Sequence, residues 1–323
     1  MLIESKNHSL ITYHIVAFLV VAVWGSTFVF TKLLLLNGLS AAQIFVLRFI
    51  IAYCLLMSYS LGRSCLKRQK DDSFQENEEA GNRKKESSFK LLADSVRDEI
   101  LMMGLGVMGG SLYFLTENSA MNYTTTTNTS LIVCLCPLFA ALLISAVYTS
   151  ERLRKIQIAG TLIAAMGVAV VVLNGHFVLH LSPRGDLLAL TACLCWAFYS
   201  LLMIPAGKCY DTVFITRKVF FYGLVSMIPY FMFRPGWPPA EVILRPDILT
   251  NLLFLGCVAS MICFVAWNEV LRRLGAMTAT NYVYLNPVVT VLFAWLVLSE
   301  QITIYFLAGT LLILFGMYLA DRK

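Results

Sequence analysis

The sequence predicts an all-α integral membrane protein of ten transmembrane helices, arranged as two inverted-topology five-helix repeats. Three observations predict this fold: an apolar composition, ten apolar runs long enough to span a bilayer, and a set of residues that recurs at a fixed offset. Of the 323 residues, 59% are hydrophobic and only 14% are charged. Soluble domains carry about 25% charged residues, so we expect the bilayer to take up most of the apolar surface.

Each of the ten apolar runs is close to the ~20 residues that a helix needs to cross a ~30 Å hydrocarbon core. The first run is too long for the apolar region of a signal peptide, so no cleavable signal is expected. The expected spans are 14–36, 41–61, 98–117, 127–148, 156–174, 186–204, 215–233, 249–270, 277–298 and 302–320.

Lysine and arginine set the expected orientation, because they are enriched in cytoplasmic loops. With the N-terminus inside, the inner segments carry 18 of these residues and the outer segments carry three, namely Arg184, Arg234 and Arg245. We therefore expect both termini in the cytoplasm, in a multi-pass protein of the cell (inner) membrane.

Residues 67–90 interrupt the apolar pattern with a mixed-charge stretch that contains almost no apolar residue. Such a stretch does not bury enough apolar surface to fold by itself, so we expect a disordered cytoplasmic insert. We interpret it as a solvated linker, with a regulatory or partner-binding role as the alternative.

Seven pairs of residues recur in the same order at an offset of 149 or 150. The pairs are Gly106/Gly256, Phe114/Phe264, Asn118/Asn268, Pro137/Pro287, Glu151/Glu300, Gly160/Gly309 and Gly167/Gly316. Chance does not supply seven ordered pairs, so the chain is predicted to be a duplication of residues 14–174 and 186–320. Because five spans is an odd number, the second copy enters the membrane from the opposite side. Inverted repeats of this kind are typical of secondary transporters.

Further characteristic motifs and residues lie near the start of each half and around the repeated residues. They are Trp24-Gly25-Ser26, Leu47-Arg48-Phe49, Pro137-Leu138-Phe139-Ala140, Ser150-Glu151-Arg152, Gly160, Gly167, Trp196, Asn286-Pro287, Glu300, Gly309 and Gly316. On the basis of these motifs and the ten expected spans, the chain resembles the EamA family of the drug/metabolite transporter superfamily. The resemblance covers nearly the whole chain, apart from residues 67–90. The resemblance implies an exporter fold whose cavity is lined by helices 1, 3, 4, 6, 8 and 9. The second half departs from the first, because Arg48 is matched only by Lys218 or Arg217.

Arg48 lies about eight residues into the second span, roughly 12 Å deep at ~1.5 Å per residue. A central arginine costs at least ~2.5–3.5 kcal/mol and faces the bundle interior or water. Two interpretations remain open: a residue that pairs with an anion or gates a pathway, and a structural arginine that binds carbonyls at an opened helix end.

Glu117 and Asn118 close the third span, and Asn268 and Glu269 close the eighth. A carboxylate buried in a membrane is a candidate for proton transfer, because desolvation disfavours its charged form. The favoured alternative for both glutamates is a carboxylate at a helix end that faces water. For Glu269 this alternative is supported by two arginines one turn away.

Aromatic and amide side chains gather in the middle of the spans that the family uses for its cavity. We expect them to line a pocket suited to an amphipathic organic solute. Together with Arg48, Glu117, Asn118 and Asn268, the candidates are Trp24, Ser26, Tyr113, Trp196, Tyr199, Trp267, Asn281, Tyr282 and Asn286.

Pro137 and Pro287 are expected in mid-span, where proline removes a hydrogen bond and kinks a helix. The kinks are interpreted as paired bends that let the halves move, or as static features. The glycines at 160, 167, 309 and 316 are seven residues apart in each half, hence on nearly one helix face, and predict close helix packing.

No GxSxG, P-loop or HExxH motif is present, and the nine cysteines have no metal-ligand spacing. We therefore expect no catalytic residue, no cofactor and no metal site, and a protein that is not an enzyme.

The predicted function is a secondary transporter that exports small organic metabolites or drug-like solutes by alternating access. The expected partners are the bilayer and a small-molecule solute, with no nucleic acid; a coupling proton or ion and a homodimer are left open. The alternatives are a membrane-embedded lipid-modifying enzyme and a non-transporting receptor or scaffold.

Overall fold

The computed structural model describes residues 2–75, 90–124, 129, 132–148, 154–173, 182–233, 236–289, 292, 303–320 and 322. Within these residues the chain forms helices and turns and no strand. Six helical runs are long and apolar enough to cross a membrane, so the chain is a multi-pass integral membrane protein. The six are Leu10–Leu36, Ala41–Cys65, Val96–Tyr123, Pro183–Cys209, Thr212–Phe233 and Pro246–Leu274.

Three shorter apolar helices complete the apolar set, at Cys136–Val147, Lys155–Val171 and Ile304–Ala320. The first half contains α1 (Leu2–Leu36), α2 (Ala41–Gln75), α3 (Val96–Gly106), the π-helix η1 (Val107–Leu112), α4 (Tyr113–Tyr123), α6 (Cys136–Val147) and α7 (Lys155–Leu173). The second half contains α8 (Pro183–Cys209), α9 (Thr212–Val225), α10 (Ile228–Phe233), α11 (Ala240–Ile243), α12 (Pro246–Leu253), the π-helix η3 (Phe254–Ile262), α13 (Cys263–Leu274), α14 (Ala276–Asn281), the 3₁₀-helix η4 (Tyr282–Leu285) and α16 (Ile304–Ala320).

Helix starts follow ordinary capping chemistry. Ser95 accepts a hydrogen bond from the Asp98 backbone N–H at 3.1 Å at the start of α3. Asp211 caps α9 in the same way through the N–H of Val213. These caps satisfy N–H groups that have no partner inside the helix.

Several predicted boundaries change in the structure. The α2 helix continues to Gln75, so the prediction of a disordered insert is wrong for residues 67–75, and 76–89 lie outside the described residues. The third span runs on to Tyr123. Pro137 lies in the first turn of α6, not in mid-span, because the chain turns just before it. Parts of the fourth and ninth spans lie outside the described residues, so the count of ten stays a prediction.

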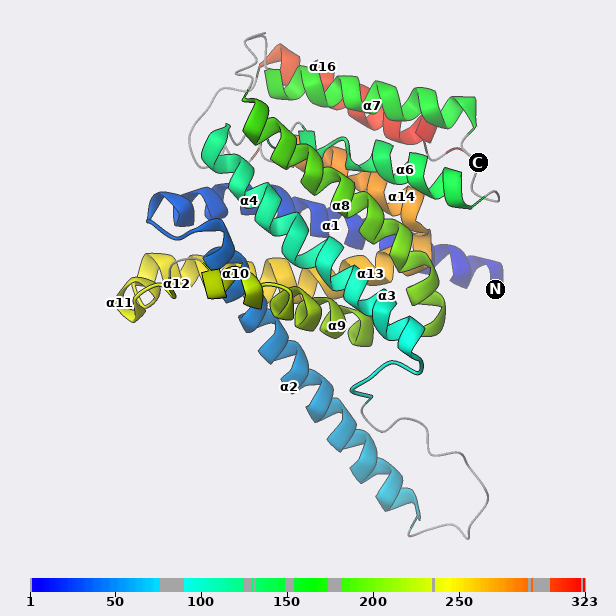
Figure 1. Ribbon diagram of the computed structural model, residues 1–323. Helices are drawn as coiled ribbons and strands as arrows, with labels where there is room; N and C mark the ends of the chain where they lie inside the picture. Colours follow the sequence, from blue (N-terminus) through cyan, green and yellow to red (C-terminus); the bar gives the residue numbers. More distant parts are fainter. Residues whose placement is uncertain are drawn as a thin grey trace.

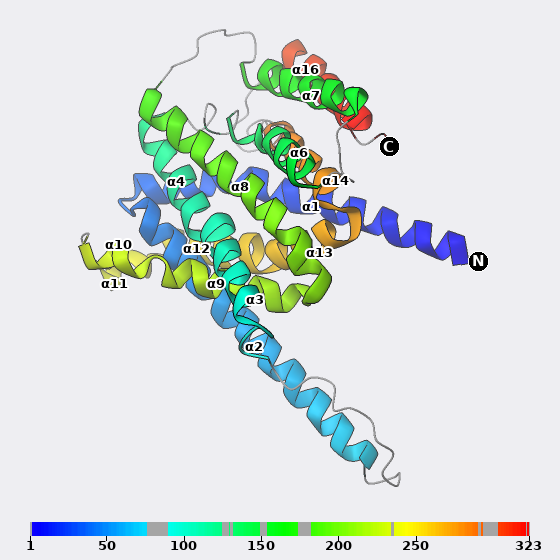
Figure 2. The same cartoon turned by 45° about the vertical axis from the view of Figure 1, so that its right-hand side comes forward.

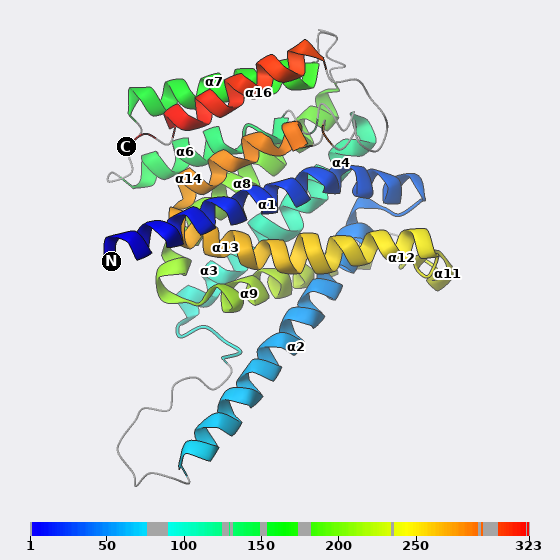
Figure 3. The ribbon, with the colours of Figure 1, turned by 180° about the vertical axis from the view of Figure 1, so that it is seen from behind.

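The N-terminal end of α1 and the C-terminal end of α16 lie at the same end of the bundle (Figures 1 and 3). We call it the terminal end. The opposite end, where α1 turns into α2 and where α11 lies, is the far end (Figure 1).

Two π-helices occupy corresponding places in the two halves. A Cβ at Gly106, next to η1, would lie 2.5 Å from the Cβ of Tyr222 on α9. A Cβ at Gly256, within η3, would lie 2.7 Å from the Cβ of Ile51 on α2. Both glycines therefore admit a neighbouring helix at a distance that any other residue would prevent.

The α7 and α16 helices form a closely packed pair at one side of the bundle (Figure 2). A Cβ at Gly160 would lie 2.6 Å from the carbonyl oxygen of Gly316, and one at Gly167 would lie 2.7 Å from that of Gly309. The contact partner moves back along α16, from Gly316 to Gly309, as α7 advances from Gly160 to Gly167, so the two helices are antiparallel. The predicted packing role of the four glycines is confirmed.

We expect Gly316→Ala to lower the melting temperature in detergent. The added methyl would lie 2.3 Å from the backbone nitrogen of Ala164, and overpacking costs ~1–3 kcal/mol, more than the ~0.5–1 kcal/mol that alanine gains in a helix. Gly62→Ala is the control, because no atom lies within 4 Å of its Cβ position. Equal melting temperatures for the two variants would contradict the close contact.

Candidate functional site

A cavity of about 40 Å³ lies between helices of both halves, and we call it the central chamber. It has room for about three water molecules. Six of the predicted residues line it: Trp24, Arg48, Tyr113, Glu117, Trp196 and Asn286. The sequence analysis missed six further lining residues, Thr27, Phe28, Phe114, Val133, Phe264 and Val283. Thr27 and Phe28 could have been found from their position, three and four residues after Trp24 on one helix.

Aromatic rings from both halves pack against one another at the chamber. The Trp24 ring packs edge-on against Trp196 from the other half, with centroids 5.4 Å apart, and lies 5.1 Å from the Trp267 ring. The Trp24 indole N–H donates to the carbonyl oxygen of Ala259 in η3 at 2.9 Å. This bond fixes the orientation of the Trp24 ring beside the chamber.

Arg48 brings a buried positive charge to the chamber, with 2% of its surface exposed. Its Nε donates to Ser260 Oγ at 2.8 Å, and its guanidinium carbon lies 4.4 Å from the centroid of the Phe114 ring. The two terminal nitrogens have no hydrogen-bond partner among the described residues. They are the donors that an anionic group in the chamber would meet.

Glu117 brings a negative charge to the same chamber. The side chain is buried, and the Tyr113 hydroxyl donates to its Oε1 at 2.7 Å. Because α4 continues beyond this residue to Tyr123, the interpretation of Glu117 as a water-facing carboxylate at a helix end is wrong. Within the described part of the chain, Glu117 and Arg48 form no ion pair with each other, although both line the chamber.

Tyr199, Trp267 and Asn268 are fully buried and do not line the chamber. The Tyr199 hydroxyl donates to Asn268 Oδ1, and Asn268 Nδ2 donates to Thr216 Oγ1 at 2.9 Å. This cluster ties α13 to α8 and to the first turns of α9.

Asn118 stands at the repeat position of Asn268 and has a comparable contact. Its Nδ2 donates to the carbonyl oxygen of Ala41 at the start of α2, at 3.5 Å. Neither amide lines the chamber. Both asparagines therefore form hydrogen bonds to a neighbouring helix and do not contact the cavity.

Three more predicted residues also lie away from the chamber. The Ser26 hydroxyl donates to the carbonyl oxygen of Val23 in its own helix at 2.7 Å. Asn281 and Tyr282 line a separate cavity at the terminal end, and the Tyr282 hydroxyl lies 2.7 Å from His14 Nδ1.

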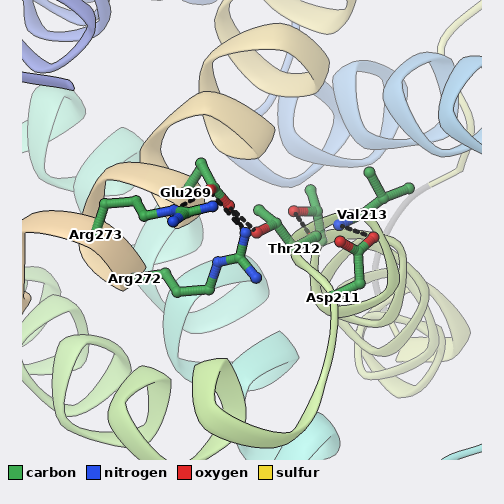
Figure 4. A network of polar contacts seen from close by, with 7 residues as sticks. Asp211, Thr212, Val213, Glu269, Arg272 and Arg273 are labelled. Atoms are coloured by element: carbon green, nitrogen blue, oxygen red, sulfur yellow. Dashed lines mark hydrogen bonds and ion pairs between the residues drawn. The ribbon is translucent and has the colours of Figure 1, made fainter. Parts of the chain in front are cut away.

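Glu269 joins α13 to α9 at the terminal end (Figure 4). Its carboxylate accepts hydrogen bonds from Arg272 at 2.7 Å, from Arg273 at 2.8 Å and from the Thr212 hydroxyl at 2.6 Å. The two expected arginine contacts are present, and the contact with Thr212 adds a tie to the neighbouring helix.

Another ion pair, more deeply buried, joins α9 to α3. Lys218, with 4% of its surface exposed, pairs with Glu99 on α3, and the Tyr222 hydroxyl donates to the same carboxylate. The sequence analysis did not single out Glu99 as a site residue, although a charge at the start of a predicted span is a signal for one.

The contacts of two glycines bear on the predicted counterpart of Arg48. A Cβ at Gly106 would meet Tyr222 and one at Gly256 would meet Ile51, and these two contacted residues are 171 positions apart. The same offset from Arg48 leads to the apolar Val219, one residue beyond the predicted match at Lys218 or Arg217.

Comparison with known proteins gives the family. A model described as the EamA-like transporter family matches residues 11–173 and 183–320. An uncharacterized transporter of Archaeoglobus fulgidus is 26% identical over 99% of both chains. A probable terminal-alkyne amino-acid exporter of Streptantibioticus cattleyicolor is 27% identical over 70% of this chain and 74% of that protein. A crystal structure that covers 97% of this chain and 96% of its own has a TM-score of 0.68 at 18% identity, which shows the fold alone.

We expect Asn268→Leu to lower the melting temperature more than Asn118→Leu does. The first change leaves the Tyr199 and Thr216 hydroxyls without their amide partner, whereas the second removes one hydrogen bond of 3.5 Å. Each buried group left unsatisfied costs ~1–3 kcal/mol. Thermal unfolding of the two purified variants in detergent checks the order, and the reverse order would contradict the assigned ties.

Proposed function

The chain belongs to the EamA-like transporter family, and we propose that it is a secondary exporter that moves small organic solutes by alternating access. The observation that carries the proposal is the central chamber, where Arg48 and Glu117 face one cavity between aromatic walls from both halves. Its relatives are named as transporters and an exporter, not as enzymes. A lipid-modifying enzyme is therefore set aside.

We infer that residues 14–174 and 186–320 are two inverted copies of one five-helix unit, with both termini in the cytoplasm. Three observations support this inference. The family model matches two segments of similar length. The π-helices η1 and η3 pack on α9 and α2 at equivalent glycines. The glycine faces of α7 and α16, the last helix of each copy, meet in antiparallel order.

The chemistry of the chamber favours a zwitterionic solute. A carboxylate would receive hydrogen bonds from the free terminal nitrogens of Arg48, and an ammonium group would face Glu117. The rings of Trp24 and Trp196 add apolar surface and attract cations through their faces. The name of the Streptantibioticus relative, an amino-acid exporter, fits a solute with these two groups.

Transport requires the chamber to change shape. Its volume of about 40 Å³ is too small for an amino acid, whose binding pocket in proteins exceeds ~300 Å³. The Thr216–Asn268 and Thr212–Glu269 hydrogen bonds join α9 to α13 toward the terminal end. We propose that these contacts break when the chamber opens to that side, and that protonation of Glu117 is one means of coupling.

The proposal is tested in proteoliposomes loaded with radiolabelled amino acids, without nucleotide. We expect a measurable efflux, and a decrease of about tenfold in Trp24→Ala, corresponding to ~1.4 kcal/mol of lost solute binding. Trp237→Ala is the matched control, because this tryptophan is exposed and outside the chamber. Unchanged efflux in folded Trp24→Ala, or equal losses in both variants, would count against the chamber as the transport site.

A second experiment assigns the two charges. Arg48→Gln should weaken transport of an amino acid about 10- to 100-fold, the effect of ~1.5–3 kcal/mol for a hydrogen bond to a charged group. The same variant should transport the decarboxylated amine as the wild type does. Glu117→Gln should weaken transport of both compounds. The efflux rates of the amino acid and of the amine, measured separately in each variant, check this pattern. An equal decrease of both efflux rates in Arg48→Gln would contradict the assignment.

A further inference from the structure

A second cavity, of about 250 Å³, lies at the terminal end between α14, η4 and α16. It shares no lining residue with the central chamber and is larger. Its six lining residues are Thr278, Asn281, Tyr282, Met317, Tyr318 and Arg322. Five of them carry hydrogen-bonding groups, and none is acidic.

Arg322 gives this cavity an accessible positive charge. One terminal nitrogen donates to the Tyr318 hydroxyl at 2.5 Å, and the guanidinium carbon lies 4.8 Å from the centroid of the same ring. No carboxylate pairs with Arg322 in the described part of the chain. The tyrosine therefore holds the guanidinium at the cavity, with N–H groups left for an anion.

Asn281 is the second observation that indicates a ligand. Its side chain is more than nine-tenths buried and lines the cavity. Within the described residues, its amide has no hydrogen-bond partner. Because this amide lines the cavity, its N–H groups can donate to a ligand with acceptor oxygens. The adjacent Tyr282 is fixed by His14.

The surroundings place the cavity at the edge of the bilayer. Tyr13, His14 and Tyr318 lie near it or line it, and Arg273 packs over the Tyr13 ring. Aromatic and basic side chains are typical of the membrane–water interface. The outer face of α16 exposes Leu311, Leu314 and Phe315, as a lipid-facing surface does.

We propose that this cavity binds the phosphate-bearing headgroup of an anionic phospholipid. Arg322 would pair with the phosphate, and the Asn281 amide would donate to one of its oxygens. Because none of the described lining residues is acidic, a headgroup with its own ammonium finds no counter-charge among them, which favours phosphatidylglycerol over phosphatidylcholine. The predicted orientation places this end in the cytoplasmic leaflet, where anionic lipids are abundant.

The bound headgroup would also have a structural effect. The α16 helix packs mainly on α7, and it touches the rest of the bundle at α14 and η4, the elements that form this cavity. A lipid bound between α14 and α16 would therefore hold the α7–α16 pair against the remaining helices.

The test uses the full-length protein in mixed micelles and counts retained lipids by native mass spectrometry. We expect phosphatidylglycerol to be retained about fivefold or more over phosphatidylcholine, the effect of one basic side chain at an anionic surface. Arg322→Gln and Asn281→Leu should each remove this preference. Arg245→Gln, which removes an exposed arginine paired with Asp247 at the far end, should keep it.

Two outcomes would overturn the proposal. Equal retention of phosphatidylglycerol by the wild type and both cavity variants would show that the headgroup binds elsewhere. Suppose instead that millimolar glycerol 3-phosphate displaces the lipid and raises the melting temperature of the protein as much as phosphatidylglycerol does. This result would assign the cavity to a soluble phosphate. Arg322→Gln changes an exposed residue beyond the end of α16, so a folded variant is expected even if Asn281→Leu is unstable.

Discussion

The structure depends on how one permanently charged guanidinium is accommodated in an apolar bundle. Burying Arg48 costs at least ~2.5–3.5 kcal/mol, and it is offset by the bond to Ser260 and the face of the Phe114 ring. Ser260 reaches Arg48 because α2 lies close to η3, and that approach depends on Gly256, whose Cβ would lie 3.1 Å from the Arg48 carbonyl oxygen. A glycine, a π-helix and an arginine therefore act together to place a charge in the chamber.

The two halves of the chain contribute differently to the protein. The first half supplies the basic and the acidic side chain that line the chamber, Arg48 and Glu117. The second half places Asn268 and Glu269 where they form hydrogen bonds with residues of α9. The charged groups of the chamber and the polar contacts between α13 and α9 therefore come from different halves.

The sequence predicted the glycine packing, and six of its thirteen cavity candidates line the chamber, because buried charges and repeated glycines are strong signals in apolar helices. It could not predict which side of a helix a polar residue takes. Asn281 and Asn286 are five residues apart, hence about 140° apart on a helix at ~3.6 residues per turn, and the 3₁₀ segment between them alters the phase again. Asn118 follows Glu117 by one position and faces α2 instead of the chamber. The extension of α2 to Gln75 was missed because charged residues can continue an exposed helix as well as leave it.

In the proposed mechanism, one chamber is reached from each side of the membrane in turn. The most direct measurement is the reactivity of Thr27→Cys, a chamber residue on α1, in a variant whose nine native cysteines are replaced. A membrane-impermeant thiol reagent is added to either side of oriented vesicles during solute turnover. Alternating access predicts modification from both sides, with the solute slowing each reaction. Modification from one side alone, while the solute continues to be transported, would contradict it.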